Sequence, residues 1–181
     1  MLMTTAPESP RNLDYLTFVD YAVDKANREL PQVDPTAMRM VLTLHRVTSA
    51  LVYDLEASVH RPRGWSWPGF RILFVLWLAG PMEGKRIAEL SGNSRAAVSA
   101  LVNTLERDGL VTREKAEHDR RAVQITLTDR GHHAITDAFR EHNQRERAWA
   151  NALTRPEQTI FIGLLEKLMH GMTEVAEKRR S

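Results

Sequence analysis

Residues 84–131 have the sequence GKRIAELSGNSRAAVSALVNTLERDGLVTREKAEHDRRAVQITLTDRG. A short helix is predicted first, and the Ser-Gly-Asn sequence at 91–93 is typical of a turn. A second helix is expected over residues 94–107. Two strands follow, around a charged tip at 115–121. The segment therefore predicts the order helix, turn, helix and β-hairpin.

Apolar and polar residues separate on the second helix of this segment. The residues at helical spacing that should be buried are Val98, Leu101, Val102 and Leu105. The opposite side is small and polar, with one cation near its beginning, and consists of Arg95, Ala96, Ser99, Ala100 and Asn103. Such a face lets a helix approach a groove closely, although it is also compatible with an ordinary solvated surface. In the short helix, Ile87, Ala88 and Leu90 are expected to point inward.

The end of the segment predicts a β-hairpin and another helix. Gly109 is expected to end the second helix with a positive φ angle. Strands are predicted over 110–113 and 123–127, and the alternation in the latter places Val123, Ile125 and Leu127 inward. Thr128 is expected to cap a long helix that runs to about residue 152. Helix, turn, helix and hairpin in this order are typical of a winged helix-turn-helix, which places one helix in the major groove of DNA.

Long helices are predicted on both sides of this unit. Their ranges are 13–30, 35 to about 60, 67–79, 129–152 and 154 onward. Together they carry more apolar surface than the reading unit alone can cover, which favours a symmetric dimer. The predicted fold class is mainly α with a small β-wing: a winged helix-turn-helix flanked by long dimerisation helices.

The composition is that of an ordinary globular protein, with 43% apolar and 27% charged residues. The absence of cysteine excludes disulfides and thiolate metal ligands. We find neither a signal-peptide pattern nor an apolar run near the ~20 residues of a membrane span, so a cytoplasmic protein is expected. Residues 61–131 hold 12 basic and 8 acidic residues, whereas residues 1–34 hold 3 and 6. The positive excess thus falls on the segment expected to meet phosphate.

No catalytic constellation is recognisable. The chain has no glycine-rich phosphate loop and no hydrolase motif of Ser, His and Asp. His132 and His133 are adjacent, so their side chains diverge on a helix and do not indicate a metal site. We therefore expect neither an enzyme nor a cofactor.

Three short sequences in the segment resemble the MarR family of winged-helix transcriptional regulators. They are LERDGLV at 105–111, Asp119-Arg120-Arg121, and LTDRG at 127–131, preceded by Ala88-Glu89-Leu90. The resemblance covers about residues 35–175, with a reading unit at 67–131, a helix-turn-helix at 84–107 and a wing at 110–127. It leaves 1–34 as an N-terminal extension with a helix, and assigns 132–181 to C-terminal dimerisation helices. Members often carry arginine where this chain has Ala100.

The resemblance implies a homodimer that binds pseudo-palindromic double-stranded DNA, usually as a repressor released by a small molecule. The candidates for the major groove are Ser94, Arg95, Ala96, Ser99 and Asn103. On the wing, Asp119 would pre-orient Arg121, and Arg120 or Arg121 would enter the minor groove. The expected phosphate contacts are Lys85, Arg86, Arg113 and Lys115. A solvated charged turn is the simpler alternative for the wing.

An effector pocket is the last expectation. In similar proteins the junction between the dimer helices and the reading unit receives aromatic or phenolic molecules. The candidate ligand-binding residues are His45, Arg46, Trp65, Trp67 and Phe70, of which the arginine would hold a carboxylate. Aromatic residues at helical spacing are more often core, and that alternative stays open. A protein-interaction module that keeps the fold without reading DNA is the alternative function.

Overall fold

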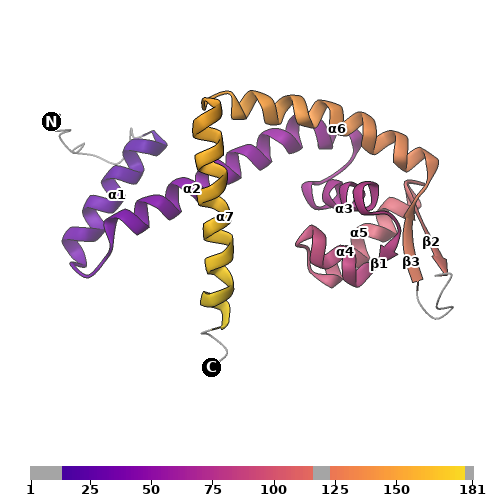
Figure 1. Ribbon diagram of the computed structural model, residues 1–181, viewed down its shortest axis with the longest axis horizontal. Helices are drawn as coiled ribbons and strands as arrows, with labels where there is room; N and C mark the ends of the chain where they lie inside the picture. The colour runs from indigo at the N-terminus through magenta and orange to yellow at the C-terminus, as the bar shows by residue number, and fades with distance from the viewer. Residues whose placement is uncertain (1–13, 116–122, 178–181) are drawn as a thin grey trace. The chain divides into compact units, whose positions relative to one another are not determined.

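The computed structural model describes residues 14–115 and 123–177, and side chains as far as residue 171. The chain divides into two compact units, one up to Asp54 and one from Leu55. The second unit contains the short helices, the strands and the last two long helices (Figure 1). The elements are α1 (Tyr15–Glu29), α2 (Pro35–Leu55), η2 (Glu56–His60), η3 (Arg61–Arg63), α3 (Trp67–Ala79), β1 (Met82–Glu83), α4 (Gly84–Ser91), α5 (Arg95–Arg107), β2 (Val111–Lys115), β3 (Val123–Leu127), α6 (Asp129–Ala150) and α7 (Arg155–Glu177).

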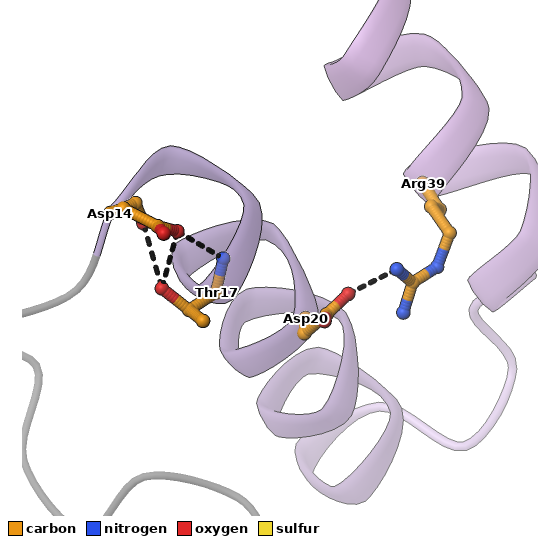
Figure 2. A network of polar contacts seen from close by, with 4 residues as sticks. All are labelled: Asp14, Thr17, Asp20 and Arg39. Atoms are coloured by element: carbon orange, nitrogen blue, oxygen red, sulfur yellow. Dashed lines mark hydrogen bonds and ion pairs between the residues drawn. The ribbon is translucent and has the colours of Figure 1, made fainter. Parts of the chain in front are cut away.

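Aspartates cap both helices of the first unit. The Asp14 carboxylate accepts hydrogen bonds from the Thr17 amide at 2.9 Å and the Thr17 hydroxyl at 2.7 Å (Figure 2). Asp34 accepts from the amides of Thr36 and Ala37 at 2.9 and 3.0 Å, which confirms the predicted cap of α2. Both carboxylates satisfy amides that a helix leaves without internal partners.

Side chains of α1 and α2 contact each other. The Tyr15 hydroxyl donates a hydrogen bond to the main-chain carbonyl of Leu42 at 2.8 Å. Asp20 and Arg39 form an ion pair between the two helices (Figure 2). Two side chains of α1 are buried: Val19 and Val23. The N-terminal helix is thus packed against α2 by a small apolar contact with polar contacts around it.

The helix that begins at Pro35 changes its winding before it ends. Residues Glu56–His60 form a π-helical turn, so the helical segment reaches the predicted region near residue 60. Gly64, with φ +75°, then reverses the chain, and the Trp65 amide donates to the His60 carbonyl at 3.0 Å. The Ser66 side chain caps α3 by accepting from the Gly69 amide.

The core of the second unit is built around α3. Four large side chains of this helix are buried: Phe70, Ile72, Leu73 and Leu76. They belong to one cluster with buried residues of the other elements, including Ile87, Val98, Val102, Leu105, Val111, Ile125, Ile135 and Ala138. Each large side chain removed from water contributes about 1.5–3 kcal/mol, so this cluster is the main source of stability in the unit.

The sheet is antiparallel, with the strand order β1-β3-β2. In the wing hairpin, Val111 pairs with Leu127 and Lys115 with Val123. β1 was not predicted, because two residues that pair through their main chain leave no sequence pattern. β2 also continues two residues beyond its predicted end, along exposed positions that packing does not specify. None of the helices within the described ranges has an apolar stretch that could cross a membrane.

Two expectations about buried side chains were wrong. Val123 is 48% exposed, because it lies opposite Lys115 at the end of the described hairpin that is farther from the core. Leu90 is 42% exposed, and the polar Ser91 is fully buried in its place. At 100° per residue, the inner face of α4 is centred between Ala88 and Ser91, which leaves Leu90 at its margin.

The end of α5 is a Schellman motif. The Gly109 amide donates to the Glu106 carbonyl and the Leu110 amide to the Leu105 carbonyl, both at 2.9 Å. Gly109 has φ +69°, as expected for the glycine of this motif. The motif sends the chain directly from the recognition helix into β2.

The first turn of α6 lies against this motif. The Thr128 hydroxyl accepts from the Gly131 amide at 2.9 Å and donates to the Gly109 carbonyl at 2.7 Å. A Cβ atom on Gly131 would lie 1.9 Å from the carbonyl oxygen of Leu110, far inside van der Waals contact. Only glycine therefore permits this approach of α6 to the chain between α5 and β2.

We predict that Gly131→Ala destabilises the protein by about 1–3 kcal/mol or more, because the methyl group must displace main-chain atoms. Gly84→Ala is the matched control, since its Cβ would meet the nearest atom at an ordinary 3.8 Å. Chemical denaturation would measure both. Equal stabilities of the two variants would contradict the close approach.

Candidate nucleic-acid interface

The outer face of α5 is exposed over its whole length. Its exposed residues are Arg95, Ala96, Ser99, Ala100 and Asn103. The inner face is held by Val98, Val102 and Leu105, all of them buried. The predicted separation of the two faces is confirmed, and the outer face has only one cation, at the N-terminal end. Residues near the N-terminus of a recognition helix are those that meet base edges in helix-turn-helix proteins.

Ser94 caps this helix. Its side-chain oxygen accepts a hydrogen bond from the Ala97 amide at 3.1 Å. The hydroxyl hydrogen is left to donate, and the helix N-terminus carries a partial positive charge that attracts phosphate. Ser94 can therefore hold the helix and contact DNA at the same time.

The turn before α5 is anchored to α3. Gly92 takes the left-handed conformation, with φ +66°. The Asn93 side-chain amide donates to the Ser91 hydroxyl at 3.1 Å and, more weakly, to the Pro68 carbonyl at 3.4 Å. Since Pro68 lies in the first turn of α3, these contacts fix the angle at which α5 leaves the turn.

Arg113 joins the wing to the recognition helix. Its guanidinium forms an ion pair with Glu106 and donates to the Asn103 side-chain oxygen at 2.6 Å. Because the oxygen of Asn103 is occupied, its NH₂ group is the part left to donate to an acceptor on DNA. The sequence suggested Arg113 only as a phosphate contact, and its role in orienting Asn103 was not foreseen.

The remaining DNA candidates are surface residues where they are described. Lys85, Arg86 and Lys115 are exposed. Arg86 forms an ion pair with Glu89 at 2.9 Å, and its hydrogen bond lowers the pKa of the Glu89 carboxyl. Asp119, Arg120 and Arg121 lie outside the described residues.

The ligand candidates fall in both units. His45 and Arg46 belong to the first unit, where the Arg46 guanidinium lies 4.9 Å from the centre of the Tyr15 ring. Trp65, Trp67 and Phe70 belong to the second unit. Trp65 and Phe70 are buried, and the rings of Trp67 and Phe70 stack at 5.9 Å. These aromatic residues therefore contribute to the core.

A buried histidine pair lies next to Phe70. Nε2 of His60 is 3.2 Å from Nδ1 of His142, and Nε2 of His142 is 3.1 Å from the Glu146 carboxylate. The carboxylate requires a hydrogen on Nε2 of His142, so Nδ1 of His142 accepts the hydrogen of His60 Nε2. Nδ1 of His60 is buried without a hydrogen-bond partner among the described residues. The pair connects η2 to α6.

Both histidines are held neutral. Burial, assisted by the nearby His142 and Arg63, lowers the pKa of His60 from the usual 6.5 to about 4. Burial also lowers the pKa of His142, against the opposing effect of Glu146. Sequence reasoning placed His142 on the inner stripe of its helix but did not pair it with His60, 82 residues earlier.

The stability of the protein should therefore depend on pH. Near pH 6.5 the unfolded chain takes up a proton on His60 that the folded chain accepts only near pH 4. The free energy of unfolding should be complete above pH 6.5 and fall by about 3 kcal/mol as the pH drops to 4. Denaturation across this range is the measurement. The double variant His60→Phe, His142→Leu should flatten the slope, whereas the exposed control His170→Gln should keep it; equal slopes would refute this origin.

An anchored turn, a recognition helix with a small polar outer face and an antiparallel hairpin define a winged helix-turn-helix DNA-binding protein. A family model described as "MarR family" matches residues 65–123. YwaE of Bacillus subtilis (strain 168), described as an uncharacterized HTH-type transcriptional regulator, is 35% identical over 132 residues, which are 73% of this chain and 77% of YwaE. The chain belongs to the MarR family, and it is a transcriptional regulator rather than an enzyme.

Solved structures share the fold. AbsC, a MarR family transcriptional regulator from Streptomyces coelicolor, aligns with a TM-score of 0.71 at 22% identity, over 78% of this chain and 97% of AbsC. NadR in complex with 4-hydroxyphenylacetate aligns with a TM-score of 0.60 at 24% identity, over 70% of this chain and 89% of NadR. At these identities the structures confirm the predicted fold class, and the roles of individual residues stay predictions.

Proposed function

We propose that this regulator is a cytoplasmic homodimeric repressor that binds a pseudo-palindromic operator and is released by a small aromatic or phenolic effector. The observation that carries the DNA-binding part is the outer face of α5. It is exposed, small and polar, and it begins with Arg95 and the capped helix N-terminus. A helix with this face can approach base edges without a steric barrier.

Each candidate has a role in this proposal. Arg95, Ser99 and Asn103 contact base edges, with Asn103 acting as a donor because Arg113 holds its oxygen. Ala96 allows a close approach, and Ser94 contacts the backbone while it caps the helix. The phosphate contacts are Lys85, Arg86, Arg113 and Lys115. On the wing, Arg120 or Arg121 enters the minor groove and Asp119 orients Arg121.

The exposed face of α7 supports a dimer. Six large apolar side chains of this helix are between 42% and 64% exposed: Ile160, Phe161, Ile162, Leu164, Leu168 and Met169. So many exposed apolar groups on one helix are typical of a protein interface. A second copy of the chain is the proposed occupant, because a two-fold pair would present two α5 helices to successive major grooves, about 34 Å apart.

The complex of NadR with 4-hydroxyphenylacetate supports an effector of this chemical class. An effector releases DNA only to the extent that it binds better to the form of the dimer that does not fit the operator, typically by 1–3 kcal/mol. From the sequence, the proposed effector contacts are His45, Arg46, Trp65, Trp67 and Phe70.

Binding to the DNA that flanks its own gene should be saturable, with a steep dependence on salt concentration. Arg95→Ala and Arg121→Ala should each weaken it by at least about 1 kcal/mol, since each removes a contact to a base or a groove. Arg147→Ala, an exposed arginine of α6, is the control and should bind like the wild type. Electrophoretic mobility shifts would measure these affinities. If no binding is found even at low salt, the fold serves as a protein-interaction module instead.

The double variant Ile160→Glu, Leu164→Glu should be monomeric, because two carboxylates would be buried in the proposed interface. Thr159→Glu adds a charge to the opposite side of the same helix and should leave the dimer intact. Light scattering after gel filtration would give the masses. A variant that stays dimeric with wild-type affinity would show that α7 is not the interface.

A further inference from the structure

A cavity of about 570 Å³ lies between η3, the end of α5 and the first turns of α6. This volume is within the range of small-molecule sites. None of the residues proposed to contact DNA lines it. The lining residues are Arg63, Trp65, Arg107, Asp108, Leu110, Arg130, Ala134 and Asp137.

The apolar part of the lining comes from the core. Trp65 is 7% exposed and Leu110 is 5% exposed, so each presents an edge of an otherwise buried side chain. Ala134 of α6 is half-buried beside them. This apolar part can take the ring of a ligand, because transfer of an apolar ring out of water is favourable.

The three arginines differ in their existing contacts. Arg63 is already engaged, since it donates to the Val59 carbonyl and to the Glu141 carboxylate, each at 2.7 Å. Arg107 has only a long surface contact of 3.5 Å with Asp108. Arg130 forms no ion pair with residues of the described ranges, and its guanidinium lies over Gly109, where a Cβ atom would be 3.5 Å from Nη1.

Three arginines face two aspartates around this cavity, and one of the aspartates, Asp137, also forms an ion pair with Arg140. The balance is positive by one charge. A site with an apolar part and one unmatched cation suits a monoanion that has a flat apolar body.

We propose that this cavity binds a small aromatic carboxylate, with the carboxylate on Arg130 and Arg107 and the ring against Trp65, Leu110 and Ala134. The ligand is held at the C-terminal end of α5. Arg95 lies 12 residues earlier on the helix, about 18 Å away, so the ligand does not touch the reading residues. The proposal rests on the proposed function only for the consequence that the ligand changes DNA affinity.

Binding can be measured on the full chain without DNA. The probe is 4-hydroxyphenylacetate, followed by calorimetry and by tryptophan fluorescence, and its neutral counterpart is 4-hydroxyphenylacetamide. The acid should bind at least about tenfold more tightly than the amide, because the amide loses the charge-assisted contact.

Four variants locate the site. Arg130→Gln should weaken binding of the acid at least about tenfold. Arg147→Gln, at an exposed position later on the same helix, should not change it. Asp137→Asn should tighten binding about two- to fivefold by removing a repelling carboxylate, a gain that partial unfolding cannot produce. Arg46→Gln, in the first unit, should have no effect.

Three results would overturn the proposal: no binding of the acid at millimolar concentration, equal affinity for acid and amide, or loss of binding in Arg46→Gln with Arg130→Gln unaffected. Mobility shifts on operator DNA with and without the acid form a separate measurement. If DNA binding fails while the acid binds as described, the proposed function is wrong and the site stands. If DNA binds but the acid does not, the site is wrong and the DNA-binding proposal stands.

Discussion

The close approach of Gly131 to the Leu110 carbonyl is the constraint on which the second unit depends. Three segments meet there: the end of the recognition helix at Gly109, the beginning of the wing, and the first turn of α6. The Thr128 hydroxyl bonds to two of them, with Gly131 as donor and the Gly109 carbonyl as acceptor. Because no side chain fits at residue 131, the position of α5 relative to α6 is set by main-chain contacts, which tolerate little adjustment.

The two ends of α5 are held by different partners. The N-terminal end is fixed through Asn93 to α3, and the C-terminal end through Leu110 to α6. Between them, Arg113 ties the middle of the helix to the wing. Exposed ion pairs such as Arg113 with Glu106 add only about 0.2–1 kcal/mol to stability. The contribution of this pair is therefore orientation, since it fixes which end of the Asn103 amide faces outward.

Much of the fold was predictable because it follows from local rules. Helix caps at Asp34, Ser94 and Thr128, and the positive φ of Gly109, depend on a few neighbouring residues. The failures arose where distant contacts decide. β1 exists only because β3 pairs with it, and the burial of Ser91 in place of Leu90 reflects the exact angle of α4 on the core.

The same distinction applies to the site. The exposed face of α5 follows from helical spacing and was predicted residue by residue. The contact of Arg113 with Asn103 joins two elements, and the His60–His142 pair joins residues 82 positions apart, so neither leaves a local pattern. The cavity is lined from three separate segments, which is why Trp65 was predicted as a ligand residue without the arginines that accompany it.

These contacts suggest how a signal could reach the DNA. A ligand shifts a conformational equilibrium only by its difference in affinity for the two states. α6 is held at its beginning by the Gly131 contact, is joined to η2 by the His60–His142 pair, and leads into α7, the proposed dimer helix. A change in how α6 packs near Arg130 would therefore act on the end of α5 and on the dimer helix together. Because operator binding requires two recognition helices about 34 Å apart, a small rotation of α6 is sufficient to change affinity without any contact between effector and DNA.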